Sequence, residues 1–136
     1  MRLTLLLLCC AALWMGACGD DDDVNADRLG VGAECTSDDD CLQSRHDGGL
    51  TERCLMQFKG GYCGIVDCEQ NADCPEGSAC VIHEDGRNYC FRTCADKPEC
   101  NRNRSAENES NCSSNVDYTD GDKDTIGKAC VPPSDG

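Results

Sequence analysis

The sequence predicts a small disulfide-rich protein, made of tandem four-cysteine modules with short β-hairpins and irregular loops, and with little or no helix after an N-terminal signal peptide. Two observations lead to this fold class. From Cys35 onward only twelve residues are large aliphatics or phenylalanine, too few to offset a chain entropy cost of about 1–2 kcal/mol per residue. The same stretch holds twelve cysteines, and an even number of cysteines in a core-poor exported chain is typical of a disulfide framework.

Export is predicted from the first segment. Residues 1–17 begin with a single basic residue, Arg2, and continue with an apolar run from Leu3 to Met15 that only Thr4 interrupts. This run has the length of a signal-peptide core and is shorter than the ~20 apolar residues of a transmembrane helix. We therefore expect residues 1–17 to be a signal peptide.

A cysteine stands where this segment ends. The motif "MGAC", Met15–Cys18, has an apolar residue, two small residues and a cysteine, and it resembles a bacterial lipobox. The resemblance implies cleavage before Cys18, lipid on its thiol (palmitate among the acyl groups) and attachment to a membrane. Since the four adjacent carboxylates of Asp20–Asp23 repel each other, residues 18–34 are expected to be an acidic, flexible tether.

The twelve remaining cysteines fall into three groups of four, at 35–63, 68–90 and 94–136. Each group opens with two cysteines that have five residues between them, in "CTSDDDC", "CEQNADC" and "CADKPEC". An acidic residue stands before the second cysteine each time, at Asp40, Asp73 and Glu99. The third group, with its polar loop and tail, diverges most.

Turn signals predict a hairpin in each of the first two groups. Asp85-Gly86 separates "CVIHE" from "RNYCF", and Lys59-Gly60 separates "CLMQF" from "GYCGIV". Two-residue links of the Asp-Gly type between such runs indicate β-hairpins. The polar stretch 101–115 of the third group has no such pattern and is expected to be a mobile loop.

The second group carries a more specific pattern. "C-x5-C-P-x-G-x2-C", over Cys68–Cys80, resembles the Dickkopf N-terminal and colipase-like cysteine-rich domains. That resemblance implies bonds from the first cysteine to the third and from the second to the fourth. Carried to all three groups, it implies the pairs Cys35–Cys54, Cys41–Cys63, Cys68–Cys80, Cys74–Cys90, Cys94–Cys112 and Cys100–Cys130. The whole chain resembles the cysteine-rich lipoproteins of myxobacteria.

The remaining residues offer little for catalysis. His46 lies in a polar loop and His83 is expected on the solvent side of a hairpin, so neither is expected to be catalytic. The cysteine spacings do not match zinc knuckles.

Asp120, Asp122 and Asp124 alternate like the first ligands of an EF-hand, but the glycine and the final glutamate of that loop are missing. They remain a weak calcium candidate beside the simpler interpretation of a solvated acidic loop; no other cofactor is expected.

Charge limits the class of partner. The formal net charge is −14, which argues against nucleic acid and favours solubility or a cationic partner. Four aromatic residues are either contact residues for a protein partner or a miniature core over the disulfides: Phe58, Tyr62, Tyr89 and Phe91.

These observations favour a non-enzymatic, lipid-anchored binding or structural module on the bacterial outer membrane or cell surface. Lipid on Cys18 is expected to attach it to the membrane. A protein partner is possible, but the sequence does not identify one. The alternative is a freely secreted, extracellular ligand or inhibitor. The N-glycosylation sequons at Asn103, Asn108 and Asn111 favour that alternative.

Overall fold

The structure is a computed structural model that describes residues 24–42 and 49–135. The predicted signal peptide, Cys18, Asp20–Asp23 and His46 lie outside the described residues. Within the described ranges, no helix is both long and apolar enough to cross a membrane.

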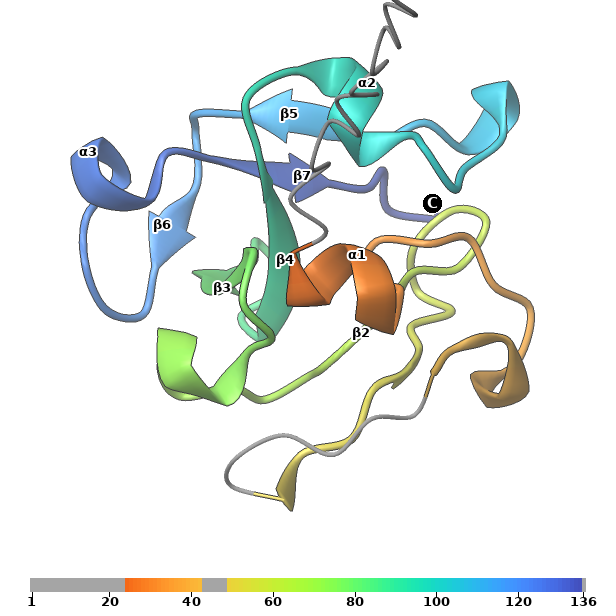
Figure 1. The fold of residues 1–136 in the computed structure, drawn as a ribbon, viewed down its shortest axis with the longest axis horizontal. Helices are drawn as coiled ribbons and strands as arrows, with labels where there is room; N and C mark the ends of the chain where they lie inside the picture. The colour runs from red at the N-terminus through yellow and green to blue at the C-terminus, as the bar shows by residue number, and fades with distance from the viewer. Residues whose placement is uncertain (1–23, 43–48, 136) are drawn as a thin grey trace, which may run out of the picture.

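Short antiparallel strands and one-turn helices make up the fold (Figure 1). The strands are β1 (Arg53–Cys54), β2 (Cys63–Gly64), β3 (Ser78–Ile82), β4 (Asn88–Cys94), β5 (Asn111–Ser113), β6 (Asp117–Tyr118) and β7 (Lys128–Val131). The helices are α1 (Asn25–Leu29), α2 (Lys97–Cys100) and α3 (Lys123–Ile126), with 3-10 turns η1 (Asp38–Asp40), η3 (Asn71–Asp73) and η4 (Ala106–Asn108). The predicted fold class, small and disulfide-rich with hairpins and irregular loops, is confirmed.

Six disulfides join the twelve cysteines from Cys35 onward. They are Cys35–Cys54, Cys41–Cys63, Cys68–Cys80, Cys74–Cys90, Cys94–Cys112 and Cys100–Cys130. In each group the first cysteine bonds to the third and the second to the fourth, which is the pattern that the colipase-like resemblance implies.

One sheet crosses the boundaries between the cysteine groups. Its strand order is β5-β7-β4-β3-β6, while β1 and β2 form a separate hairpin. Strand β4 pairs with β3 along its length and with β7 at its end, where Thr93 faces Ala129. Since β4 belongs to the second group and β7 to the third, these groups share a sheet.

The β3–β4 hairpin has a longer turn than predicted. Ile82 pairs with Asn88, and His83 N–H donates to the Arg87 carbonyl at 2.9 Å. Three residues, 84–86, therefore form the turn instead of the two expected. A two-residue type I′ turn needs positive φ at both central positions, and of Asp85 and Gly86 only Gly86 has it, at 81°.

The acidic residue before the second cysteine has one structural role in all three groups. Asp40 accepts the Thr36 N–H at 2.8 Å, Asp73 accepts the Glu69 N–H at 2.8 Å, and Glu99 accepts the Ala95 N–H at 2.6 Å. Each carboxylate thus closes a one-turn helix between two cysteines, at η1, η3 and α2. These backbone N–H bonds lower the pKa of Asp40 and Asp73 below the usual range.

The four aromatic candidates form the core, so the core interpretation of them is correct. Phe58, Tyr62, Tyr89 and Phe91 are at most 1% exposed. The Phe58 ring lies 5.2 Å from Tyr89 and 5.6 Å from Phe91, both edge to face, a preferred aromatic geometry. Apolar residues from all three cysteine groups surround this cluster.

Residues 24–34, predicted to be part of a flexible tether, instead pack on the core. Ala26 in α1 is fully buried and Val31 is 2% exposed. Ala26 N–H donates to the Glu76 carbonyl at 2.7 Å, and Cys63 N–H donates to the Ala33 carbonyl at 2.9 Å. In Figure 1, α1 lies beside β4. Two buried apolar side chains and these backbone bonds hold the segment.

The polar stretch 101–115 is ordered, which corrects the prediction of a mobile loop. It contains η4 and β5, and Ser110 is fully buried. The guanidinium of Arg104, a residue 9% exposed, donates to the carbonyls of Asn108, Lys59 and Gly61 at 2.7 to 2.9 Å and to that of Gly32 at 3.2 Å. It also lies 5.6 Å from the centre of the Tyr62 ring. Arg104 therefore ties the third cysteine group to the first group and to the N-terminal segment.

We predict that Arg104→Lys lowers the free energy of unfolding by about 3 kcal/mol, since an ammonium cannot reach four diverging carbonyls and leaves some unpaired. The measurement is guanidinium chloride denaturation without reductant. Arg87→Lys is the control: Arg87 pairs with Asp67 at the surface, where such a change costs about 1 kcal/mol or less. Equal effects of the two substitutions would contradict the role given to Arg104.

Candidate functional site

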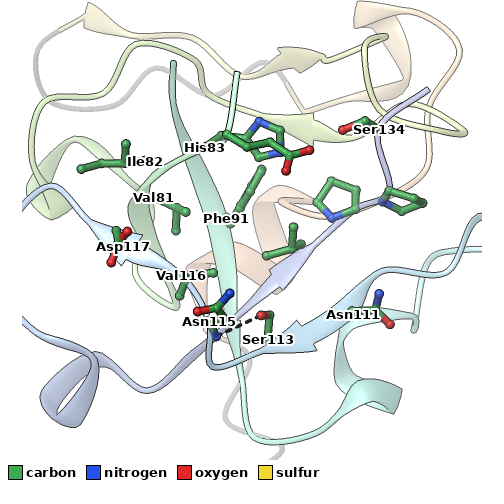
Figure 2. Close-up of a pocket in the computed structure, with 14 residues that line it drawn as sticks. Val81, Ile82, His83, Phe91, Asn111, Ser113, Asn115, Val116, Asp117 and Ser134 are labelled. Atoms are coloured by element: carbon green, nitrogen blue, oxygen red, sulfur yellow. Dashed lines mark hydrogen bonds between the residues drawn. The ribbon is translucent and has the colours of Figure 1, made fainter. Parts of the chain in front are cut away.

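An open groove crosses the five-stranded sheet and is the best candidate for a binding site. Its volume is about 510 Å³. Figure 2 shows Val81 and Phe91 at its floor, from β3 and β4, and the row from Asn111 to Asp117 along one side. Val131, Pro132, Pro133 and Ser134 of the C-terminal segment also line it, and Val131 is the cross-strand partner of Asn111 in the β5–β7 pair.

The chain connectivity explains why the sheet is hollowed here. β5 and β6 are the two edge strands of the sheet, yet only residues 114–116 connect them. The step from Ser113 to Asp117 can span at most about 14 Å, whereas four strand spacings in a flat sheet amount to about 19 Å. The sheet must therefore curl to bring its edges together, and the groove lies in that curl.

Polar side chains alternate along one wall of the groove. Asn111, Ser113, Asn115 and Asp117 all line it, at every second position, as expected for one face of an extended chain. The Asn115 backbone N–H donates to Ser113 Oγ at 3.1 Å, the bond drawn in Figure 2. This wall offers amide, hydroxyl and carboxylate groups above an apolar floor.

His83 was predicted to face solvent, but it lies in the floor of the groove. Its side chain is 8% exposed, and its ring contacts Phe58 edge to face at 5.3 Å. Ile82 is 47% exposed, and since side chains alternate along a strand, its neighbour His83 points inward. His83 Nδ1 lies 3.2 Å from Asp85 Oδ1.

A second concavity continues the groove past His83. It also measures about 510 Å³, and it shares His83, Glu84 and Ser134 with the first. Asp85 and Asp135 line it as well. Burial opposes ionisation of Asp85, but the hydrogen bonds donated by Tyr89 Oη and the Arg87 N–H outweigh it and lower the pKa of Asp85.

Two of the three calcium candidates have structural roles. Asp122 caps α3 by accepting the Thr125 N–H at 2.9 Å, and Asp120 accepts the Asn71 N–H at 2.7 Å. The groups of three or more metal-ligating side chains that converge in the described residues are all cysteines, and their members are bonded in disulfides. The structure does not bring Asp120, Asp122 and Asp124 into one such group.

The sequence contains a signal for one wall of the groove. Asn111, Ser113, Asn115 and Asp117 have the two-residue period of a strand, although their polarity favours a loop. The strand that contributes Val81 to the floor has a weaker two-residue pattern. Cys80 in the same strand is buried in a disulfide, so buried and exposed side chains do not alternate regularly along β3.

Glu52 is a buried carboxyl group outside the groove. It is 1% exposed, and neither of its oxygens has a hydrogen-bond partner within the described residues. It lies close to Gly30, where the Cβ of any larger residue would stand 3.8 Å from Glu52 Oε1. Burial raises the pKa of Glu52 to about 7.

This carboxyl makes stability depend on pH. In the unfolded chain it ionises near 4.5, and in the folded protein near 7. Between these values the folded state binds the proton that the unfolded state releases, so stability falls as pH rises and reaches its lower level above pH 7.

We predict that Glu52→Gln, which removes the charge and keeps the size, raises the free energy of unfolding at pH 8 by up to about 3 kcal/mol. At pH 5 the effect should be much smaller, since Glu52 is then protonated in the fold. Guanidinium chloride denaturation without reductant at both pH values measures the difference. The exposed Glu69→Gln is the control, and the same pH dependence in native protein and Glu52→Gln would contradict the prediction.

Comparison with known proteins assigns no family to this fold. No protein-family description, no curated protein and no solved structure matches the chain.

Proposed function

We propose that this chain is a lipid-anchored, extracytoplasmic binding module without catalytic activity, held on the outer membrane or surface of a bacterial cell by acyl chains on Cys18. The observation that carries the proposal is the complete pairing of the cysteines from Cys35 to Cys130 in six disulfides. Such a framework forms and persists in oxidising compartments. It also leaves no thiol among these twelve for catalysis.

The lipobox-like motif supports Cys18 as the anchor. Met15–Cys18 follows an apolar run of signal-peptide length. More than one acyl chain is needed for stable anchoring, and lipoboxes direct such multiple acylation. We infer that the three cysteine groups are tandem repeats of one module, since each closes a one-turn helix with the same acidic position.

The start of the packed structure limits the distance from the membrane. The described fold begins at Val24, so six residues, 18–23, would separate the lipid from the fold. Even fully extended, they span at most about 20 Å. In an anchored protein, Val24 would therefore lie within about 20 Å of the acylated residue.

Binding is the function that the surface supports best. The groove combines an apolar floor with a wall of amide, hydroxyl and carboxylate groups, and such polar groups can fix the orientation of a ligand. The disulfides hold its walls: Cys112 lies between Asn111 and Ser113, and Cys130 precedes Val131. A rigid groove loses little conformational freedom when it binds.

A freely secreted ligand or inhibitor is the second candidate. The acceptor residues Asn103 and Asn111 are exposed, so two of the three sequons are accessible to a glycosylating enzyme. This candidate needs no lipid on Cys18.

The deciding experiment is the intact mass of the native protein, extracted in detergent and treated with an alkylating reagent without reduction. We predict a species that begins at Cys18, carries acyl groups and takes up no reagent at the other twelve cysteines. Cys18→Ser should abolish acylation. A native species without acyl mass, or with hexose increments, would favour the secreted candidate, and alkylation of the twelve would contradict the disulfide framework.

A further inference from the structure

The two concavities of the site form one elongated groove. Both are lined by His83, Glu84 and Ser134. Beyond these shared residues, the first concavity includes Asn111 and Asp117, and the second includes Gln57 and Asp135. An extended ligand fits this shape better than a compact one.

Its charge is entirely acidic. Glu84 and Asp117 line the first concavity, and Asp85 and Asp135 line the second. Among the described residues, no lysine or arginine lines either part. Walls with charge of one sign concentrate ligands of the opposite sign, so the complementary ligand is cationic.

The polar side chains of the wall are available for a ligand. Within the described part of the chain, the side chains of Asn111, Asn115, Asp117 and Glu84 make no hydrogen bond or ion pair. The side-chain amides of Asn111 and Asn115 can pair with carbonyl and N–H groups of an extended peptide. Ile82, which is 47% exposed, and the half-buried Val131 also line the groove and can contact apolar side chains of such a peptide.

We propose that this groove binds an extended segment of a partner protein that carries lysine or arginine. Apolar side chains of the segment contact Ile82 and Val131, and its cationic groups pair with Glu84 and Asp117. The inference rests on the proposed function as a binding module. It adds the chemical class of the partner and the residues that recognise it.

The test is fluorescence anisotropy with two labelled hexapeptides, alternating Val-Lys and alternating Val-Glu, and the mature protein in neutral detergent. We expect saturable binding of the Val-Lys peptide alone. Glu84→Gln combined with Asp117→Asn should weaken it by roughly fivefold. Glu69→Gln combined with Glu107→Gln removes the same charge from exposed positions outside the groove and should leave the affinity within about twofold.

Three outcomes would overturn the proposal. They are absence of Val-Lys binding, equal weakening by both double variants, and saturable binding of a neutral oligosaccharide such as maltohexaose in place of the peptide. Circular dichroism shows whether each variant is folded. Because neutral detergent suits acylated and unacylated protein alike, failure of lipid attachment would not affect this titration, and the two proposals fail independently.

Discussion

The fold depends on the covalent pairing of twelve cysteines. Each disulfide closes a loop of between 12 and 30 residues. A disulfide that closes a loop of about 15 residues stabilises the fold by about 3 kcal/mol, because it lowers the entropy of the unfolded chain. The six contributions do not simply add, because the loops overlap. The cystines also supply apolar volume: two of the three buried clusters consist mainly of cysteine, with Ile65 and Ala33 as neighbours. A chain poor in aliphatics thereby obtains part of its core from its cross-links.

Disulfides alone would leave three separate units, since each bond stays within its own group. The aromatic cluster around Phe58 and the guanidinium of Arg104 join them. Phe58 and Tyr62 come from the first group, Tyr89 and Phe91 from the second strand of the β3–β4 hairpin. Arg104 connects the third group to backbone carbonyls of the first. The buried guanidinium is stable in this position because backbone carbonyls accept its N–H groups and the Tyr62 ring forms a cation–π contact with it. These contacts make one core out of three covalently closed units.

Local chemistry was readable from the sequence, and tertiary contacts were not. The fold class followed from cysteine content, and both hairpins followed from Lys59-Gly60 and the Asp85-Gly86 region, because these signals act over a few residues. The burial of His83 was accessible from strand alternation but was outweighed by its polarity. The docking of α1 was not accessible, since Ala26 and Val31 show no periodic pattern and follow an aspartate run. The role of Arg104 was not accessible either, because three of the four carbonyls that accept its hydrogen bonds lie more than forty positions away in the chain.

The same cross-links connect location to binding. Cys112 and Cys130 lie opposite each other on the neighbouring strands β5 and β7. Cys112 is disulfide-bonded to Cys94, and Cys130 to Cys100. The paired strands β5 and β7, which carry Asn111, Ser113 and Val131 of the groove, are thus anchored to the segment that ends β4 and forms α2. Reduction of these two disulfides would release β5 and β7 and restore their conformational freedom. Binding would then carry an ordering cost of about 0.5–1.5 kcal/mol for each immobilised side chain. A groove of this construction is preorganised only where its disulfides persist, so the binding that we propose would be strongest in an oxidising environment.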